Sequence, residues 1–546
     1  MEILLCALPL LYAKLLTNRT DTIILVVQKI LKFVLFLLSC LLTPFLKLQC
    51  LKKRKRLPAI KNPLLLLSAG EIARQIRRKE VSCDEVVRAY IERCKEVNPV
   101  LNAIVESRFD DAIQEARKVD QLLAATEKSM EELAREMPLL GVPITVKESI
   151  AVEGMSHSVG VKKKIPDKAK ENAVVVDMVR NAGAIILLVS NTPELCLFWE
   201  TNNKVTGPTW NPYDSNRVAG GSSGGEAALL SSAGSVVSLA SDVAGSARLP
   251  AMFCGVYGHK PTAGLVSSTG HKPISTDKHW AEYFTIGTMA RYAEDLPLMM
   301  KIISQSAATK TRFDEKVSLK NMKFFYLENC CGITNSIDKD MKRAIQRLRT
   351  HIEGAHGKKV QKAQLTDMKF AFDIATNLLL QIDVEGVTEE IKAVGTGKIW
   401  LEVLKYIFLV SPYTLPSISY GVLKWITGKL PKRLYTNLAK KKISLKKQFE
   451  DLLGDNGVLI YPTFVSASHY QYQSYTKVAN ATYMMIYNAL GLPVTQCPMG
   501  LNKNGLPIGL QIVANAGNDH LTIAVAQEIE RAFGGWQPPP AAKLEV

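Results

Sequence analysis

Two serines flanked by glycines, Ser222 and Ser246, have the residue type and setting that nucleophilic catalysis requires. Ser222 lies in the run Gly-Gly-Ser-Ser-Gly-Gly at positions 220–225, and Ser246 follows Asp-Val-Ala-Gly at positions 242–245. Glycine at this density marks backbone that turns sharply or passes close to another group, so a serine between glycines is open to whatever approaches it. A serine hydroxyl is a poor nucleophile until a base removes its proton. The stretch therefore predicts acyl-transfer chemistry and requires a base from elsewhere in the chain.

The two serines differ in the structure that their surroundings predict. The first matches the G-x-S-x-G pattern of a nucleophile elbow, but an elbow needs a strand directly before the serine, and residues 211–217 have the composition of a loop. Ser246 instead follows a predicted strand at 236–240 and a tight turn, and precedes a helix that begins near residue 247. Backbone N–H groups at such a junction converge on one point, as an oxyanion requires. Ser246 is therefore the preferred nucleophile, and an elbow at the first serine stays as an alternative.

Histidine is the usual base for a serine nucleophile, and lysine is the other candidate in this sequence. None of the 8 histidines lies in a recognisable triad context, but His259 follows the helix predicted after Ser246 and could serve. Lys147 lies near the end of residues 139–148, an apolar segment that we expect to form a short buried strand. Burial lowers the pKa of a lysine and populates the neutral amine, which can accept a proton. From the residues alone, both candidates remain open.

The elements that must position these residues alternate between helices and strands. Ser68 can cap a helix over 72–78, Ser82 and Glu85 can form a capping box for the next helix, and residues 110–136 read as one charged, alanine-rich helix. After the Lys147 strand come a helix at 173–181, a buried strand at 184–189 and a helix at 226–233. This alternation predicts an α/β fold with helices on both faces of a sheet. Neither a repeat nor an obvious linker divides the body, so we expect one large domain.

The N-terminal part of the chain has the composition of a membrane anchor. Residues 23–46 are mostly apolar and long enough to cross a bilayer core. A basic segment follows them instead of a small-residue cleavage site, which favours a retained anchor over a cleaved signal peptide. We therefore expect an anchor with its basic segment at 1–56 and a catalytic domain at 57–546. The positive-inside rule places that domain on the cytosolic side, whereas a hairpin with the apolar residues 3–16 would leave both ends on one side.

Charge and cysteine content exclude several classes of function. About half of the formal net charge of +17 belongs to residues 1–56, and the rest is spread in short clusters without a nucleic-acid-binding motif, so no nucleic-acid partner is expected. The 10 cysteines show no paired C-x-x-C spacing and no histidine-rich partner region. Neither a metal site nor a disulfide framework is predicted. We expect no metal and no cofactor.

The Lys147 segment, the Gly-Gly-Ser-Ser-Gly-Gly run and residues 242–248 together resemble the amidase-signature family. The resemblance extends from about residue 66 to residue 536 and includes Gly-Leu-Pro-Val at 491–494 and Gly-Leu-Pro-Ile-Gly-Leu-Gln at 505–511. The separations of 75 residues from Lys147 to Ser222 and 24 from Ser222 to Ser246 are those expected of the membrane-anchored fatty-acid amide hydrolases, and the sequence as a whole resembles their type 2 most. The resemblance implies a single catalytic domain with a mixed β-sheet covered by helices.

The resemblance also implies the roles of the site residues. Ser246 is the nucleophile, Ser222 the bridging serine and Lys147 the base of a Ser-Ser-Lys set. The further residues that it implies are the oxyanion donors Val243, Ala244, Gly245 and Ser246, the acyl-channel residue Cys196, and the supporting residues Ser223, Asp242 and Arg248. One departure is that the family's commoner turn has two glycines before the nucleophile, and here the first of them is Ala244. If that position needs a positive φ, alanine costs about 1 kcal/mol there.

The implied activity is hydrolysis of fatty acid amides, meaning primary amides and N-acylethanolamines, through an acyl-enzyme. Fold and catalytic set do not choose the substrate, so the anchor carries that choice, together with the apolar residues 400–430, which are either core or an interfacial cap. The expected partners are a lipid amide and a membrane, either an endomembrane or a lipid droplet, bound by one span or in the plane. A homodimer stays open. The alternatives are an amidase of small soluble amides, an amidotransferase subunit, an α/β-hydrolase-type lipase or esterase, and a catalytically silent membrane-bound binding protein.

Overall fold

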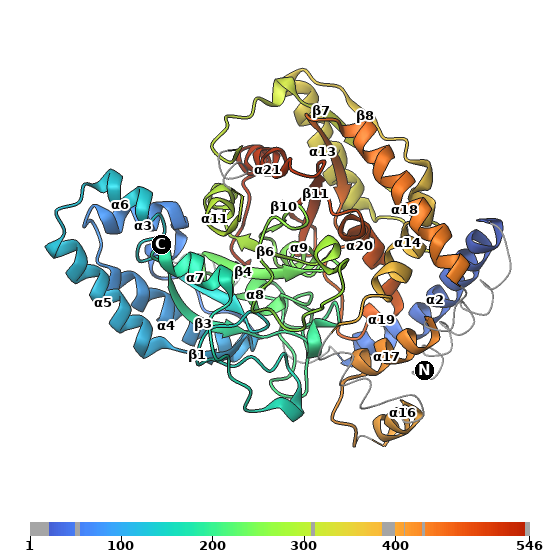
Figure 1. The fold of residues 1–546 in the computed structure, drawn as a ribbon, viewed down its shortest axis with the longest axis horizontal. Helices are drawn as coiled ribbons and strands as arrows, with labels where there is room; N and C mark the ends of the chain where they lie inside the picture. The colour runs from blue at the N-terminus through green and yellow to red at the C-terminus, as the bar shows by residue number, and fades with distance from the viewer. Residues whose placement is uncertain are drawn as a thin grey trace.

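The structure, a computed structural model, describes residues 21–49, 55–306, 312–384, 399–408, 410–427 and 432–540. Its centre is an 11-stranded sheet in the order β1-β3-β2-β4-β6-β5-β10-β11-β9-β7-β8. Helices flank this sheet, with α3 to α6 around its β1 end and α14 and α18 around its β8 end (Figure 1), whereas α13 packs on β11, β9 and β8. The predicted α/β class is therefore confirmed. The strands are β1 (Ile104–Ser107), β2 (Pro143–Lys147), β3 (Ile185–Ser190), β4 (Val237–Asp242), β5 (Tyr257–Lys260), β6 (Thr285–Ala290), β7 (Lys323–Tyr326), β8 (Val360–Lys362), β9 (Gly457–Pro462), β10 (Val494–Leu501) and β11 (Pro507–Val513).

The helices connect these strands and cover the sheet. Helix α8 packs on β2, β4 and β6, whereas α9 packs on β5, β10 and β11. The helices are α2 (Asp21–Gln49), α3 (Ala69–Arg77), α4 (Cys83–Leu101), α5 (Phe109–Ala125), α6 (Met130–Glu136), α7 (Val174–Asn181), α8 (Gly224–Ser231), α9 (Arg248–Cys254), α10 (Trp280–Tyr283), α11 (Asp295–Ile303), α13 (Lys339–His356), α14 (Ala371–Leu379), α16 (Ile399–Ile407), α17 (Leu415–Thr427), α18 (Lys432–Leu453), α19 (Ser474–Lys477), α20 (Thr482–Ala489) and α21 (Asp519–Phe533).

The sheet is mixed, and its parallel centre sets the position of the site. Strand β2 pairs in parallel with both β3 and β4, whereas β4 pairs antiparallel with β6. Every residue of β2, β3 and β4 is buried, which matches the apolar runs that predicted them. Because neighbouring parallel strands end at the same edge, Lys147 at the end of β2 and Asp242 at the end of β4 face the same region.

The prediction of a single helix over 110–136 is wrong, because α5 ends at Ala125 and a second helix, α6, begins at Met130. Ser129 caps α6 with a complete capping box, in which its hydroxyl accepts from the Glu132 N–H and the Glu132 carboxylate accepts from the Ser129 N–H. Serine at this position offers the backbone an alternative to a continuous helix. Ser68 and Ser82 cap α3 and α4 by accepting from the N–H groups of Glu71 and Glu85, but among the described residues the Glu85 carboxylate does not accept the second bond of the predicted capping box.

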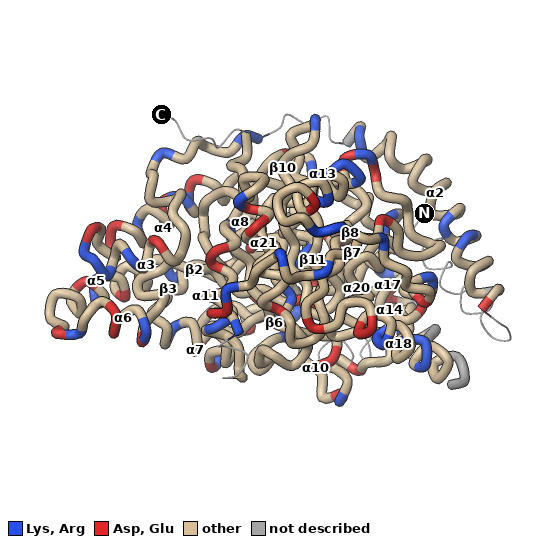
Figure 2. Tube along the Cα trace, turned by 90° about the horizontal axis from the view of Figure 1, so that it is seen from above, with Lys and Arg blue, Asp and Glu red and all other residues tan. Residues whose placement is uncertain are grey.

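Helix α2 is long and apolar enough to cross a membrane over Ile24–Leu48, although a signal sequence would pass the same test. In the structure it lies against the rest of the protein, on the side that also carries α16 and α17 (Figure 1). Val27 and Leu31 pack on Ile333 and Ala479. The buried Gln28 donates from Nε2 to Asp373 Oδ2 of α14 over 2.6 Å. Most of α2 carries no charge, whereas Lys and Arg are interspersed with Asp and Glu over the rest of the described chain (Figure 2).

Candidate active site

Lys147 is fully buried at the end of β2, where its Nζ meets two serine hydroxyls. Its Nζ lies 2.6 Å from Ser222 Oγ and 3.0 Å from Ser241 Oγ. Burial lowers the pKa of Lys147 below its ordinary value, and the thiol of Cys196 and the carboxylate of Asp242 oppose this shift only in part. The structure thus brings an amine with a lowered pKa into contact with Ser222, which lies 75 residues further along the chain.

The glycine loop holds Ser222 by packing more closely than side chains would allow. Gly220 has φ +89°, and a Cβ there would lie 2.8 Å from Cα of Pro250. A Cβ on Gly221 would lie 2.5 Å from the carbonyl oxygen of Phe198. The loop therefore packs between the start of α9 and the backbone at Phe198. Glycine is required at 220 and 221 because a larger side chain would not fit at either position. Ser222 is 1% exposed in this setting.

Ser246 lies at the predicted junction, after β4 and two residues before the start of α9, with 4% of its surface exposed. The positive φ of the turn falls on Gly245, at +98°, and Ala244 is not among the residues with positive φ. The possible cost of alanine at 244 therefore does not arise. The carbonyl of Ala244 accepts a hydrogen bond from Trp199 Nε1 over 3.0 Å, and the N–H of Gly245 donates to Asp242 Oδ1 over 2.8 Å. These two bonds fix the peptide unit between residues 244 and 245 from both sides.

An ion pair with both side chains fully buried holds the turn in place. Arg248 donates from Nε to Asp242 Oδ2 and from Nη2 to Asp242 Oδ1, each over 3.0 Å. The same guanidinium donates to Asn488 Oδ1 and Gln511 Oε1, which belong to α20 and β11. Burial alone would raise the pKa of Asp242, but the charge and hydrogen bonds of Arg248 outweigh it and hold that pKa well below its usual range. Asp242 is thus a permanent carboxylate that organises the turn.

Three of the four expected oxyanion donors are open. Within the part of the chain that the structure describes, no group accepts a hydrogen bond from the backbone N–H of Val243, Ala244 or Ser246. The fourth N–H, from Gly245, is bonded to Asp242. The two serine loops meet through backbone, since the N–H of Ser223 donates to the carbonyl of Ser246 over 3.1 Å. The arrangement can therefore place hydrogen-bond donors beside a serine that is coupled to the lysine-bound loop.

Four other side chains near the site are either predicted residues whose contacts can now be described or residues that the sequence did not predict. His259, the alternative base, contacts Thr495 Oγ1 and Asp519 Oδ1 through its two ring nitrogens, over 2.9 and 3.2 Å. The thiol of Cys196, expected in an acyl channel, lies 3.3 Å from Thr192 Oγ1 and acts on the pKa of Lys147. Ser241 and Trp199 were not predicted, because a lone serine at a strand end and a tryptophan in a loop have no motif of their own.

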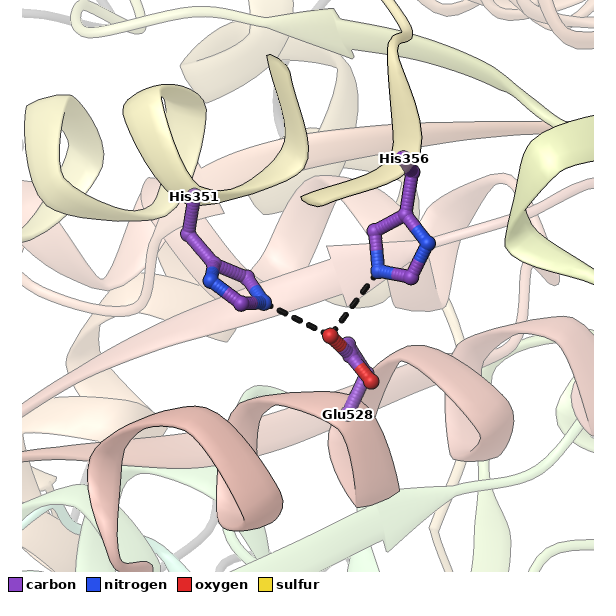
Figure 3. Close-up of side chains that lie close together, drawn as sticks. All are labelled: His351, His356 and Glu528. Atoms are coloured by element: carbon purple, nitrogen blue, oxygen red, sulfur yellow. Dashed lines mark hydrogen bonds and ion pairs between the residues drawn. The ribbon is translucent and has the colours of Figure 1, made fainter. Parts of the chain in front are cut away.

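A cluster of His351, His356 and Glu528 offers three ligand atoms that could hold a metal ion (Figure 3). The Nε2 atoms of the two histidines lie 2.6 and 2.8 Å from Glu528 Oε1. Ligands of a tetrahedral zinc ion, each about 2.0–2.1 Å from the metal, would be separated by about 3.3 Å. Arg531 also donates to both oxygens of Glu528. The cluster is therefore a set of direct hydrogen bonds that joins α13 to α21, and its geometry does not fit a metal centre.

Comparison with known proteins agrees with this geometry. Residues 85–523 match the amidase family. Human fatty-acid amide hydrolase 2 is 40% identical over 495 residues, which cover 88% of this chain and 91% of the relative. Fatty-acid amide hydrolase 2-B of Danio rerio is 40% identical over 496 residues, covering 89% and 93%. A solved structure of fatty acid amide hydrolase has the same fold, with a TM-score of 0.68 at 20% identity and 86% of both chains covered. Because the family match spans most of its length, this chain belongs to the amidase-signature family and is an amide hydrolase.

Proposed function

We propose that the protein hydrolyses fatty acid amides at a membrane surface, with Ser246 as nucleophile, Ser222 as proton relay and Lys147 as base. The observation that carries the catalytic part is the 2.6 Å contact between Lys147 Nζ and Ser222 Oγ in a fully buried site. An amine in this setting has a lowered pKa, which favours the neutral form that can act as a base. The same contact argues against a catalytically silent binding protein, which would not need a buried lysine next to a serine hydroxyl.

The proposed reaction begins when Ser246 Oγ bonds to the amide carbonyl carbon. The proton of Ser246 passes to Ser222, and the proton of Ser222 passes to Lys147. The carbon–nitrogen bond then breaks as Lys147 returns a proton through Ser222 to the amine, which leaves poorly unless it is protonated. Water attacks the acyl-enzyme and regenerates Ser246. One amide and one water thus become one carboxylic acid and one amine.

The negative oxygen of the tetrahedral intermediate needs donors that are already in position. We assign this role to the open N–H groups of Val243, Ala244 and Ser246, while the N–H of Gly245 maintains the turn through Asp242. Hydrogen-bond donors arranged before the reaction are worth more than mobile ones, because they need no reorganisation as charge develops.

The lipid character of the substrate rests on α2. Its outward face exposes large apolar side chains, among them Phe33 at 61% and Leu41 at 67% of their surface. On α16, Leu404 and Phe408 near its end are exposed to 51% and 72%. The relatives with 40% identity are fatty-acid amide hydrolases by name. A small soluble amide would not require an apolar surface of this kind near the enzyme.

We further propose that α2 lies in the plane of the membrane surface instead of crossing it. A crossing helix would have to be surrounded by lipid, yet α2 buries Gln28 against Asp373 and packs Val27 on the body. Those contacts hold only when α2 runs along the catalytic body, with its other face in the headgroup and acyl region. In this view residues 57–546 are the catalytic domain and residues 1–56 its membrane segment, of which residues 1–20 and 50–54 lie outside the described part of the chain.

A fluorophosphonate probe tests the catalytic roles. We expect it to label Ser246 in the membrane-bound full-length protein and to leave Ser246→Ala unlabelled, as read by peptide mass spectrometry. Lys147→Ala should react much more slowly. Labelling predominantly at Ser222 would refute the assignment.

Two assays test the lipid proposal. Hydrolysis of oleamide should exceed that of acetamide-sized amides, and a clear preference for the short amides would refute the substrate class. For the helix, a membrane-impermeant maleimide is applied to sealed microsomes that carry Asp21→Cys or Gln49→Cys, and labelling is counted above that of the native cysteines. An in-plane helix exposes both positions on one side, whereas a crossing helix exposes them on opposite sides.

A further inference from the structure

A buried histidine that the proposed reaction does not use lies behind Lys147. His271 is 3% exposed, and its ring packs on Phe284 with the centroids 4.5 Å apart. The chain at this point runs beside the segment that follows β2, since the N–H of Lys272 donates to the carbonyl of Ser149 over 2.8 Å. His271 is therefore fixed against the end of the strand that carries the lysine.

The hydrogen bonds of His271 determine which of its nitrogens carries the proton. Nδ1 lies 3.0 Å from the carbonyl oxygen of Pro273, and a carbonyl can only accept. The proton of the neutral ring is therefore on Nδ1, and Nε2 is a bare acceptor. Burial, with Lys147 nearby, keeps the pKa of His271 far below its ordinary value, so the ring stays neutral.

Nε2 then dictates the direction of the next hydroxyl. Ser241 Oγ and Ser149 Oγ each lie 3.0 Å from His271 Nε2. Since this nitrogen has no proton to give, a hydroxyl bonded to it must point its hydrogen at it, and the two hydroxyls share its single lone pair. The oxygen of Ser241 is left with lone pairs toward Lys147, whose Nζ is 3.0 Å away. Lys147 must donate to Ser241, and a neutral amine that does so can turn its own lone pair toward Ser222 at 2.6 Å.

We propose that His271 is a positioning residue that, through Ser241, orients the neutral amine of Lys147 so that its lone pair faces Ser222. Without a bare acceptor behind it, the Ser241 hydroxyl would be free to donate to Lys147. That donation would occupy the lone pair that the reaction needs. The inference rests on the proposed catalytic roles of Lys147 and Ser222 and adds to them the device that sets the direction of proton transfer.

The titratable groups around the hydrogen-bonded series His271–Ser241–Lys147 determine what a pH titration of the activity reports. Lys147 interacts electrostatically with Cys196, Asp242 and Glu226, and His271 interacts with Lys147 and His157. The proposal leaves these neighbours in place and changes only the partner of Ser241. A shift in the acidic limb of the rate profile therefore reports on the amine itself.

The experiment compares two substitutions of His271 in the membrane-bound full-length protein. His271→Leu removes the acceptor and keeps an apolar contact with Phe284, whereas the side-chain oxygen of His271→Gln can occupy the position of Nε2. We expect His271→Leu to lower kcat about 10- to 100-fold with little change in KM, as for a misdirected catalytic group. Its acidic limb of kcat/KM against pH should move to lower pH, because a hydroxyl that donates to the neutral amine favours that form. His271→Gln should restore both quantities to near the wild-type values.

Ser149→Ala is the matched control, because the Ser149 hydroxyl also contacts His271 Nε2 but, among the described residues, makes no hydrogen bond with Lys147. It should keep the wild-type rate and pH profile. A wild-type kcat and an unmoved acidic limb in His271→Leu would overturn the proposal, as would a His271→Gln variant that behaves like His271→Leu. Thermal unfolding of each variant separates misfolding from misdirection. If the wild-type protein itself neither hydrolyses amides nor reacts with fluorophosphonate, it is the proposed function that fails.

Discussion

Replacing Gly245 with alanine should disrupt the turn before the nucleophile, whereas replacing Ala244 with glycine should not. Gly245 has φ +98°, and a Cβ there would lie 2.5 Å from Met484 Sδ and 2.8 Å from Met484 Cβ. The sulfur is on a flexible side chain, but the Cβ of Met484 can move only with its backbone. The left-handed conformation costs alanine about 1–2 kcal/mol, and forced overpacking adds about 1–3 kcal/mol. Gly245→Ala should therefore lower the free energy of unfolding by about 2–5 kcal/mol.

The loss should appear in both stability and rate. We expect a lower thermal midpoint and, because a displaced turn misplaces oxyanion donors, a fall in kcat/KM of about 100- to 1000-fold. Ala244→Gly, at a position without positive φ, should cost no more than about 1 kcal/mol and leave fluorophosphonate labelling near the wild-type rate. Scanning fluorimetry and amide hydrolysis measure the two effects. A Gly245→Ala protein with the wild-type midpoint and rate would refute this reasoning.

Three further predictions follow from buried charges. Asp242→Asn leaves the buried Arg248 without its counter-ion, so we expect the free energy of unfolding in denaturant to fall by about 3–5 kcal/mol. An unchanged midpoint would contradict a stabilising role of the Asp242–Arg248 ion pair. Burial alone would raise the pKa of Glu528, but Arg531 and the two histidines lower it to about 2 from 4.5. Its stabilisation is thus complete above about pH 4.5 and lost toward pH 2, and the midpoint difference between wild type and Glu528→Gln should shrink over that range instead of staying constant. Finally, kcat/KM should fall as pH is lowered through the depressed pKa of Lys147, because only the neutral amine accepts a proton; a rate without an acidic limb would exclude this base.

The parts of the site that the sequence predicts are those encoded by short segments. The strands that end at Lys147 and Asp242 consist mainly of small or apolar residues before those ends; β4 begins one residue after its predicted start at 236, whereas β2 begins four residues after its predicted start at 139. The serine loops are recognisable because glycine is needed wherever backbone packs on backbone. Ser129 and Glu132 also carried a visible capping signal, which should have divided the helix predicted over residues 110–136.

The parts that the sequence does not predict depend on contacts between distant segments. His271 acts on Ser241, 30 residues earlier, only because the sheet brings its loop to the end of β2. Trp199 supports Ala244 from another loop, 45 residues away. Which residue of the turn takes positive φ depends on the backbone itself, so the residue type at 244 could not decide it. The docked face of α2 is equally hidden, because an apolar helix looks alike on every side until its partners are known.

The contact between Gln28 and Asp373 also sets an order of events during synthesis. The two residues are 345 positions apart, and ribosomes add about 5–20 residues each second, so the second emerges about 20–70 s after the first. For most of that interval the apolar helix lacks these protein partners, because Ile333 comes only 40 residues before Asp373 and Ala479 follows it. During that time lipid can cover the apolar side chains of α2. The nascent chain should therefore be tethered to a bilayer before its sheet is complete, and the enzyme should mature where it will work.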